Sequence, residues 1–368
     1  MTLMTKKLKV ALVHDHLVQD GGAERVVRTL LKMYPEAPLY TAFYAPDKMG
    51  PDFAGRDIRT SFLQKLPGAT SHYKFLLTLL DRAFRSFDLS EYDVVISSAS
   101  GWAKSVRTGP RTRHVCYCHT PIRYIWSDSN RYIAETGYPW PLKAMFKVLR
   151  PLLRRWDQRA AAGVDTYVAN SRYVAARIKR YYGREAAVVY PPVAIEQFAS
   201  STLQQDYFLV ATRLEPYKRV DLVIEAFNRL QKPLKVMGAG SDEGRLHQLA
   251  GPTIEFTGRV SDHERQRLFA EAQALLNPQE EDFGITVVEA LASGTPVIAY
   301  GVGGAVEILD KTTGVFFDGQ SAGDIVRAIE AFDRSQFDPV VLRRRADDFS
   351  EERFIKELSA IIMASSKE

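Results

Sequence analysis

The sequence has little cysteine and no long apolar run, and each absence narrows what the protein can be. The 368 residues hold two cysteines, Cys116 and Cys118, which is too few for a disulfide framework and favours a reducing compartment. The two lie in one predicted strand with Cα atoms about 6.6 Å apart, near the upper limit for a disulfide. No stretch approaches the roughly 18 apolar residues of a membrane-spanning helix, and the apolar run near the N-terminus is too short for a signal peptide. We therefore expect a cytoplasmic protein.

The composition is that of a soluble globular protein with a mildly basic charge. Hydrophobic residues make up 46% of the chain and charged residues 25%, and the length is sufficient for two domains of ordinary size. The net charge of +5 and the isoelectric point near 9.0 fit an anionic ligand, an anionic membrane surface or a nucleic acid. Since no known nucleic-acid-binding module accompanies the cations, we expect no nucleic acid partner.

The N-terminal half alternates predicted strands and helices, but it lacks the Gly-x-Gly-x-x-Gly pattern of dinucleotide sites. Apolar runs predict buried strands of a parallel sheet at Leu8–Val13, Tyr92–Ser97, Arg113–Cys118 and Thr166–Ala169. Periodicity predicts helices at Glu24–Met33, Tyr73–Phe87 and Arg172–Tyr182. Gly21 and Gly22 lie in the turn after the first strand, and His119 directly follows the strand that ends at Cys118. Ligands of open α/β sheets bind at the carboxyl ends of strands, so His119 is either a ligand-binding or a structural histidine.

The C-terminal half continues the alternation. Strands are predicted at Tyr207–Val210, Leu234–Met237, Ile254–Thr257, Ala274–Asn277 and Pro296–Tyr300. Arg213 and Lys218 follow the first of these strands, and Pro216 fixes a turn between them. Two cations beside a helix N-terminus neutralise a diphosphate well. The alternative interpretation is an exposed basic loop.

The most informative stretch is Gln279–Gly304, in which three consecutive acids precede a short apolar helix. Glu281 lies in the loop before the predicted helix Ile285–Ala292, and Glu289 lies about one turn inside it. The bare N–H groups at the helix start form a site for phosphate. Acids near a helix N-terminus also suit its dipole, but Glu289 is the lone charge in an apolar helix and needs a partner. Ribose or sugar hydroxyls would serve, so the two carboxylates are predicted to flank one ligand.

Glu281 and Glu289 inside E-D-F-G-I-x-x-x-E-A, followed by G-T-P-V-I-A, resemble the nucleotide-sugar site of retaining glycosyltransferases of family 4. The resemblance covers most of residues 8–318 and is strongest over 207–310. It implies an α/β protein with the GT-B fold, in which two facing Rossmann-like domains hold a nucleotide-sugar cleft between them. The implied parts are an acceptor-side domain over 1–195, a nucleotide-sugar-binding domain over 196–350, and a helix over 351–368 that crosses back to the first domain.

The same resemblance implies roles for individual residues. Arg213 and Lys218 match an R-L-x-x-x-K pattern and would stabilise the leaving diphosphate. His119, in an H-T-P stretch, would form a hydrogen bond to a hydroxyl of the donor sugar, Glu281 would hold sugar hydroxyls, and Glu289 would hold the ribose. The other donor-binding residues implied are Gly21, Gly22, Gly258, Arg259, Phe283, Gly284, Ile285 and Thr286.

The implied activity is retaining transfer of a hexose from a nucleoside diphosphate sugar. H-D-H, C-H-T-P-x-R-Y-x-W and V-Y-P-P-V stretches resemble bacterial mannosyltransferases of polysaccharide assembly. They favour mannose from GDP-mannose and a glycan or polyprenyl-diphosphate-linked acceptor. The sequence has no Asp-x-Asp pair to hold a divalent cation on the diphosphate, so we expect no metal and no cofactor. The alternatives are another GT-B enzyme, such as a nucleotide-sugar epimerase or a phosphorylase, or a non-catalytic nucleotide-sugar-binding protein.

A basic stretch over Trp140–Arg159 has two interpretations. Its cations are interleaved with aromatic and aliphatic residues and are Lys143, Lys147, Arg150, Arg154, Arg155 and Arg159. Such a helix can lie on an anionic membrane, which would make the protein peripheral to the inner face of the cytoplasmic membrane. It can equally be a core helix with a solvated basic edge. Pro151 predicts a kink or the start of a second helix.

Overall fold

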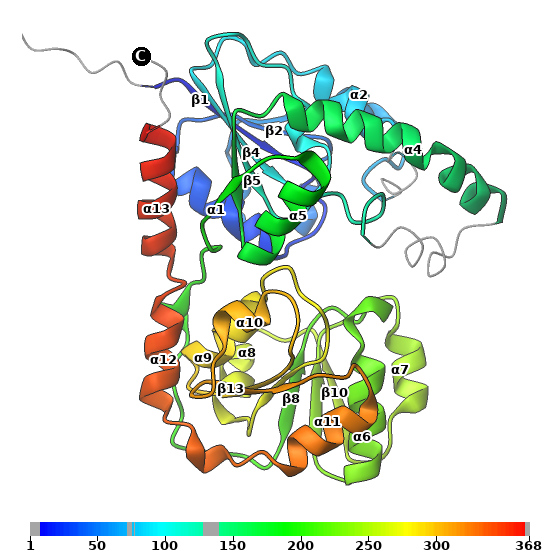
Figure 1. Ribbon diagram of the computed structural model, residues 1–368, viewed down its shortest axis with the longest axis vertical. Coiled ribbons are helices and arrows are strands. Elements are labelled where there is room, and N and C mark those ends of the chain that lie inside the picture. Colours follow the sequence, from blue (N-terminus) through cyan, green and yellow to red (C-terminus); the bar gives the residue numbers. More distant parts are fainter. Residues whose placement is uncertain (1–7, 72–75, 77, 128–139, 365–368) are drawn as a thin grey trace, which may run out of the picture. The chain divides into compact units, whose positions relative to one another are not determined.

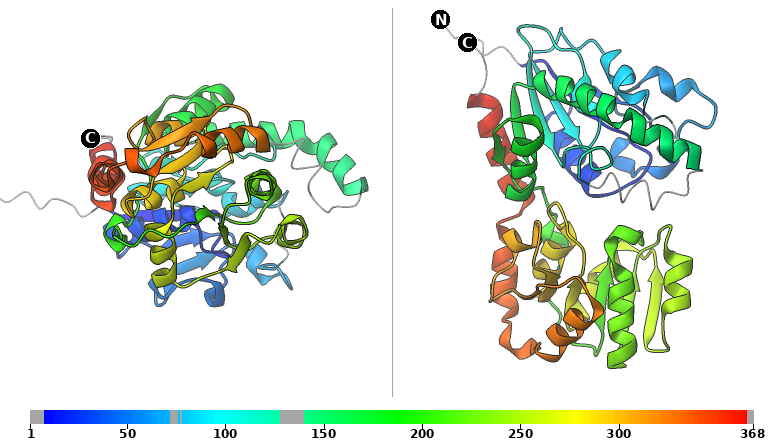
Figure 2. Two further views of the ribbon diagram at one scale, coloured as in Figure 1. Left: turned by 90° about the horizontal axis from the view of Figure 1, so that it is seen from below. Right: turned by 45° about the vertical axis from the view of Figure 1, so that its right-hand side comes forward.

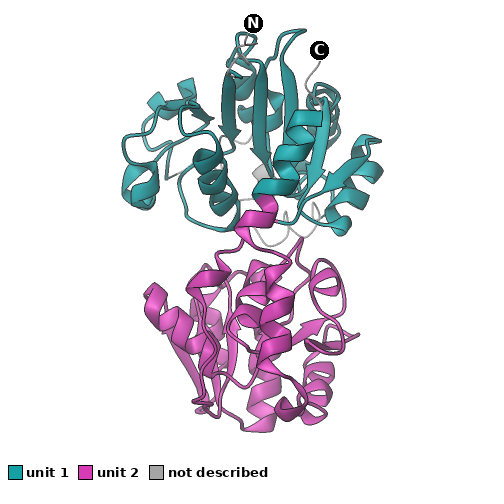
Figure 3. Cartoon of the chain, turned by 90° about the vertical axis from the view of Figure 1, so that its left-hand side faces the viewer, with its two compact units in different colours: residues 1–190, 355–368 teal, residues 191–354 magenta. Residues whose placement is uncertain are grey.

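The computed structural model describes residues 8–71, 76, 78–127 and 140–364. The chain forms two compact units (Figure 3): unit 1 comprises Met1–Tyr190 with Ile355–Glu368, and unit 2 comprises Pro191–Phe354. Each unit is built on one parallel sheet against which helices pack (Figures 1 and 2). The final helix, α13 (Glu351–Ala364), begins in unit 2 and continues in unit 1.

In the described part of unit 1, the sheet has seven strands in the order β3-β2-β1-β4-β5-β6-β7, and all pairings are parallel. The strands are β1 (Val10–His14), β2 (Leu39–Thr41), β3 (Ile58–Thr60), β4 (Val94–Ala99), β5 (Arg113–Cys118), β6 (Thr166–Ala169) and β7 (Ala186–Val188). The central strands β1, β4 and β5 are buried throughout, as their apolar runs predicted. Because the strand order reverses between β1 and β4, their carboxyl ends border the point where α/β sheets bind ligands.

The helices of unit 1 agree with the predicted pattern except at α2. They are α1 (Gly22–Met33), α2 (Leu80–Arg85), α4 (Trp140–Ala162) and α5 (Arg172–Tyr182), with short 3₁₀ turns at Pro46–Lys48, Pro51–Phe53, Phe62–Lys65 and Ala103–Ser105. The helix predicted over 73–87 is too long, since α2 begins only at Leu80; residues 73–75 and 77 lie outside the described residues. Helix α4 continues through Pro151, so no second helix starts there. The Ser171 hydroxyl accepts a hydrogen bond from the Val174 amide at 3.0 Å and caps α5.

Unit 2 has a six-stranded sheet among its described residues, in the order β10-β9-β8-β11-β12-β13, again with parallel pairings. The strands are β8 (Phe208–Ala211), β9 (Leu234–Met237), β10 (Ile254–Gly258), β11 (Leu275–Asn277), β12 (Val297–Tyr300) and β13 (Gly314–Phe317). The helices are α6 (Val220–Leu230), α7 (Glu243–Leu249), α8 (Asp262–Glu271), α9 (Ile285–Ala292), α10 (Ala305–Ile308), α11 (Ala322–Glu330) and α12 (Pro339–Asp347). Here the order reverses between β8 and β11. The expected α/β class with two doubly wound sheets is confirmed.

Two further features bear on the sequence analysis. Cys116 and Cys118 are both free and buried. Within the described residues, no helix combines the length and the apolar character needed to cross a membrane.

Candidate functional site

In unit 2, the two loops at the β8–β11 switch point are joined by a lysine–glutamate pair. Lys218 ends a 3₁₀ turn, Pro216–Lys218, in the loop after β8, and Glu281 lies in the loop after β11. The Lys218 Nζ donates to Glu281 Oε1 at 2.5 Å, although Lys218 is only 8% exposed. The Gln279 amide donates to the same oxygen at 2.8 Å. The structure therefore brings together two of the predicted residues and orients the Glu281 carboxylate.

Two glycines after β12 hold the Glu281 loop by close backbone approach. A Cβ on Gly303, whose φ is +79°, would lie 2.3 Å from the Glu281 carbonyl oxygen, and one on Gly304 would lie 2.3 Å from that of Phe283. The Gly304 amide donates to the Glu281 carbonyl at 2.8 Å. Any larger side chain would push this loop out of place, so the glycine turn that follows β12 positions Glu281.

The start of α9 leaves its backbone amides available to a ligand. Gly284, with a φ of +108°, precedes the helix, and no side chain of the described residues caps it. Phe283 is buried and packs against Phe349 with ring centroids 5.5 Å apart, which fixes the entry to the helix. Ile285 and Thr286 are half-buried in its first turn. Uncapped N–H groups and the helix dipole favour an anionic group at this position.

Glu289 is fully buried one turn into α9, and its partner is an arginine from the preceding helix. The Arg265 guanidinium on α8 donates to Glu289 Oε2 and forms an ion pair with it. The Arg265 side chain is 26% exposed and that of Glu289 1%. The partner that the sequence required for this carboxylate is thus present within unit 2. The sequence analysis did not identify Arg265.

The other predicted residues of unit 2 lie at the same edge of the sheet. Arg213 is exposed in the loop after β8 and donates to the Tyr217 hydroxyl at 3.0 Å. Gly258 ends β10 and accepts a hydrogen bond from the Gly238 amide at 2.9 Å, and Arg259 is exposed directly after it. These positions follow the carboxyl ends of β8 and β10, where α/β sheets bind their ligands.

In unit 1, His119 is part of a hydrogen-bonded chain at the β1–β4 switch point. The His119 Nε2 lies 2.8 Å from the Ser98 hydroxyl, which lies 3.2 Å from His14 Nδ1. The His14 Nε2 in turn lies 3.3 Å from Glu24 Oε1. Glu24 belongs to the first turn of α1, and Gly21 and Gly22 begin this helix. The chain therefore connects the glycine turn to His119.

The two histidines of this chain titrate in opposite directions. Burial opposes charge on His14, but the hydrogen bond and the charge of Glu24 outweigh it, so the pKa of His14 is raised. Burial likewise opposes charge on Glu24, yet the pKa of Glu24 is lowered by its bond to His14. Burial lowers the pKa of His119 to about 4, and the positive charge of His14 acts in the same direction. The pairing thus favours the charged forms of His14 and Glu24, whereas burial favours the neutral form of His119.

Sequence reasoning found His119 but not the residues that hold it. His14, Glu24 and Ser98 were missed as site residues, as was Gln279 in unit 2. The available signal was the H-D-H stretch at the end of the first strand. It was noted only as part of a family resemblance.

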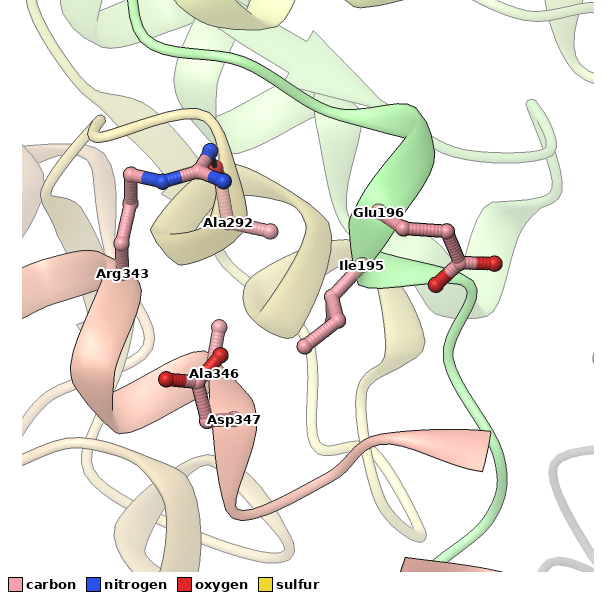
Figure 4. A pocket seen from close by; sticks show the side chains of 6 residues that line it. All are labelled: Ile195, Glu196, Ala292, Arg343, Ala346 and Asp347. Atoms are coloured by element: carbon pink, nitrogen blue, oxygen red, sulfur yellow. Dashed lines mark hydrogen bonds between the residues drawn. The ribbon is translucent and has the colours of Figure 1, made fainter. Parts of the chain in front are cut away.

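A hollow of about 230 Å³ in unit 2 lies away from these residues (Figure 4). Its lining comes from the C-terminal end of α9, from α12 and from the turn Ile195–Gln197, and consists of Ile195, Glu196, Ala292, Arg343, Ala346 and Asp347. The predicted donor residues Gly284, Ile285 and Thr286 lie at the opposite, N-terminal end of α9, Glu289 lies one turn inside the helix, and none of the four lines the hollow. The hollow is therefore not the predicted donor site.

Two parallel α/β units with charged residues at the switch points of both sheets define a protein of the nucleotide-binding α/β class. Residues 20–197 match the family model described as Glycosyltransferase Family 4, and residues 194–350 match the one described as Glycosyl transferases group 1. The chain therefore belongs to the glycosyltransferases with these two domains, whose fold is GT-B.

Relatives of this chain include glycosyltransferases with different acceptors. It is 27% identical to a D-inositol 3-phosphate glycosyltransferase of Streptomyces bingchenggensis over 70% of this chain and 61% of that protein. It is 25% identical to the O-antigen chain mannosyltransferase C of Escherichia coli over 51% of this chain and 55% of that protein. The chain spans about three-fifths of the length of the first curated relatives it matches.

Solved structures agree with the fold. The structure of Anabaena HepE in complex with UDP and glucose has a TM-score of 0.73 at 17% identity and covers 97% of this chain and 100% of that one. The lipopolysaccharide outer core galactosyltransferase WaaB has a TM-score of 0.66 at 16% identity and covers 97% and 99%. At these identities the likeness concerns the fold alone.

Proposed function

We propose that the protein is a retaining glycosyltransferase that moves a hexose from a nucleoside diphosphate sugar to a glycan or polyprenyl-diphosphate-linked acceptor in polysaccharide assembly. Mannose from GDP-mannose is the favoured donor, and the similarity to an O-antigen chain mannosyltransferase supports it. The observation that carries the proposal is the Lys218–Glu281 pair at the β8–β11 switch point, beside the uncapped start of α9. This place combines a cation and backbone amides, which suit a diphosphate, with a carboxylate, which suits sugar hydroxyls.

The diphosphate is bound by Arg213, Lys218 and the first N–H groups of α9. Lys218 is held in place by Glu281 before the ligand arrives, so little reorganisation is needed. As the bond between sugar and diphosphate breaks, negative charge grows on the leaving group, and preorganised cations stabilise it. The backbone at Gly21 and Gly22 approaches the same diphosphate, and the backbone at Gly258, with Arg259, meets the nucleobase.

The sugar and the ribose are held by the carboxylates and the histidine. Glu281 accepts hydrogen bonds from sugar hydroxyls next to the reacting carbon, where positive charge builds. His119 forms a hydrogen bond to another hydroxyl of that sugar. Glu289 accepts the ribose hydroxyls, and its pairing with Arg265 orients the carboxylate.

The test is release of nucleoside diphosphate in a coupled assay with GDP-mannose, UDP-glucose and other donors, with and without a polyprenyl-diphosphate-linked glycan. We expect acceptor-dependent release of GDP and a product with the anomeric configuration of the donor. An epimerase would convert the donor without an acceptor. A non-catalytic binding protein would be thermally stabilised by the donor without any release.

We also propose that the reaction needs no metal. The lack of an Asp-x-Asp pair and the presence of cations at the diphosphate position support this. Activity should persist in EDTA. Complete loss on chelation, restored by magnesium or manganese, would contradict the proposed diphosphate site.

Finally, we propose that the protein is cytoplasmic and contacts the inner face of the membrane through α4. This helix exposes large apolar side chains, with Trp140 79%, Val148 77% and Met145 49% exposed. The cations Lys147, Arg155 and Arg159 are exposed on it as well, and the one acid of α4, Asp157, is buried. An apolar face with cations and no exposed acid matches an anionic lipid surface, to which each cation contributes about 1 kcal/mol.

A further inference from the structure

The hydrogen-bonded chain in unit 1 has a direction, and the direction determines which nitrogen of His119 carries a proton. Ser98, His14 and Glu24 are at most 2% exposed. The chain runs from the Glu24 carboxylate through the His14 ring and the Ser98 hydroxyl to His119 Nε2. Water has little access to these groups, so the proton positions must satisfy one another.

The direction starts at the charged pair. Glu24 is an acceptor, so His14 Nε2 donates to it. His14 Nδ1 faces the Ser98 carbonyl oxygen, which has no proton to donate, so Nδ1 must be the donor and His14 carries a proton there as well; the raised pKa of His14 agrees with this. That N–H lies 3.1 Å from the Ser98 carbonyl oxygen and 3.2 Å from the Ser98 hydroxyl oxygen, both of which can only accept from it.

The Ser98 proton must then go to His119. Among the described residues, two side-chain nitrogens lie within hydrogen-bond distance of the Ser98 hydroxyl, His14 Nδ1 and His119 Nε2. His14 Nδ1 already carries a proton, so His119 Nε2 is the acceptor. If His119 instead donated from Nε2, the buried Ser98 O–H would have no acceptor, which is unfavourable. A nitrogen that accepts carries no proton, so the neutral His119 ring holds its proton on Nδ1.

We propose that Glu24, His14 and Ser98 are positioning residues that hold His119 in the Nδ1–H tautomer, so that His119 acts as a hydrogen-bond donor to the sugar. This rests on the proposed function, in which His119 contacts the donor sugar. Within the described residues Nδ1 has no hydrogen-bond partner, and the Tyr117 ring packs edge-on against His119 at 5.3 Å, which fixes its plane. A sugar hydroxyl that accepts from Nδ1 keeps its own proton for another acceptor.

Other charged groups surround the chain. Asp15 lies beside His14 and His119 and favours their protonation, but it accepts from the backbone amides of Ser100, Gly101 and Ala103 at 2.7–2.8 Å. In each of these bonds the Asp15 carboxylate is the acceptor, so it supplies no proton for His119 Nε2. His16 is buried with a lowered pKa, caused mainly by that burial.

The direct test is the tautomer of His119 in the full chain without ligand, from long-range ¹H–¹⁵N correlations of ¹⁵N-histidine-labelled protein near pH 7. His119→Asn assigns the signals. We expect His119 to be neutral with its proton on Nδ1, and His14 to be doubly protonated. If His119 of the wild-type protein carries its proton on Nε2, the proposal is wrong. This outcome does not depend on the folding of any variant.

A matched pair of variants tests the role of the hydroxyl. Ser97 and Ser98 are adjacent on β4 and equally buried, and the Ser97 hydroxyl lies 2.8 Å from His114 Nε2, the same distance as Ser98 from His119. Ser98→Ala should move the His119 proton partly or wholly to Nε2 and lower kcat/KM about tenfold, the effect of one hydrogen bond. Ser97→Ala should do neither. If the His119 tautomer is unchanged in Ser98→Ala, the positioning role is refuted. If the tautomers are as expected but the protein transfers sugar from no donor, only the proposed function is refuted.

Discussion

Arg265 and Glu289 form an ion pair between α8 and α9, 24 positions apart in the sequence. The carboxylate is completely buried, whereas the guanidinium is partly open to solvent. The charge that is foreign to the apolar helix is thus balanced before a ligand binds. Losing one partner should therefore cost less stability than losing the other. Water can solvate Arg265 if Glu289 is removed, but it cannot reach the buried Glu289 if Arg265 is removed.

The first prediction separates the two glutamates. Glu289→Gln should raise KM for the donor about tenfold and leave kcat largely intact, because ribose contacts are equal in the ground and transition states. Glu281→Gln should lower kcat more than it raises KM. Steady-state kinetics of both variants with the preferred donor provide the measurement, and the opposite assignment of the two effects would refute the roles proposed.

Stability supplies the control for this experiment. Arg265→Gln removes the guanidinium that pairs with a buried carboxylate and should cost about 3–5 kcal/mol of unfolding free energy. Glu289→Gln leaves a partly solvated guanidinium and should cost clearly less. Urea unfolding of both variants measures the difference, and equal losses would contradict the asymmetry of the pair.

The second prediction concerns the diphosphate. Arg213→Ala and Lys218→Ala should each lower kcat/KM by the equivalent of about 2–4 kcal/mol, the loss of one preorganised donor to developing charge. Lys311→Ala is the control, since Lys311 is an exposed lysine in the turn before β13, at the amino end of the sheet. If both site variants turn over like the control, the diphosphate is bound elsewhere.

The third prediction is a pH dependence of stability. Burial lowers the pKa of His114 to about 4 from an ordinary value of 6.5. Between these values the unfolded chain binds more protons than the folded one, so the free energy of unfolding rises with pH across this window and levels off above it. His114 contributes on the order of 3 kcal/mol to this rise.

The measurement is thermal unfolding at pH 5 and pH 7.5. His114→Gln should reduce the difference in Tm between the two conditions, whereas His263→Gln, at an exposed position on α8, should retain it. The same dependence in wild type and His114→Gln would show that His114 does not contribute.

The fourth prediction concerns α4. Reversing the charge of Lys147 and Arg155 should weaken binding to anionic vesicles about thirtyfold or more, from about 1 kcal/mol for each lost cation. Arg154 is unsuitable, because it donates to the Ile125 carbonyl at 2.7 Å and covers the Trp126 ring. Lys48→Glu, in an exposed turn, is the control. Equal partition of the wild type into neutral and anionic vesicles would exclude electrostatic docking.

The sequence predicts those parts of the fold that depend on local chemistry. Buried strands such as β8 (Phe208–Ala211) consist of consecutive apolar residues. Helix ends follow capping residues such as Ser261, which accepts from the Glu264 amide at 3.2 Å. Short edge strands without such runs, β3 and β7, were not predicted. Helix α2 was overextended because an amphipathic pattern does not show where tertiary packing ends a helix.

The candidate site was predicted where a motif places its residues on one loop or one helix. The motif identified Glu281 and Glu289, but not that Lys218 and Arg265 pair with them. Ser98 lies 84 positions from His14 and 21 from His119. Such partners are set by strand order, which a periodic pattern does not encode. A buried histidine or glutamate in a sequence shows that a partner is needed, but not which residue provides it.

Helix α4 is more deeply buried toward its C-terminus than in the half before Pro151. Toward its C-terminus, Leu153 is buried and Asp157 accepts from Trp126 and Tyr182 at 2.7 and 2.8 Å while pairing with Lys104 at 2.6 Å. Pro151, which lacks an N–H, separates this part from the exposed residues before it. Phe146 and Leu149 pack against the core of unit 1, but Met145, Lys147 and Val148 between them are exposed. Backbone amides of residues 143–150 should therefore exchange with deuterium before those of 153–161, because local opening there breaks fewer buried contacts. If this segment binds lipid, its backbone amides should exchange more slowly when vesicles are present. Hydrogen exchange with and without vesicles would therefore locate the contact residue by residue.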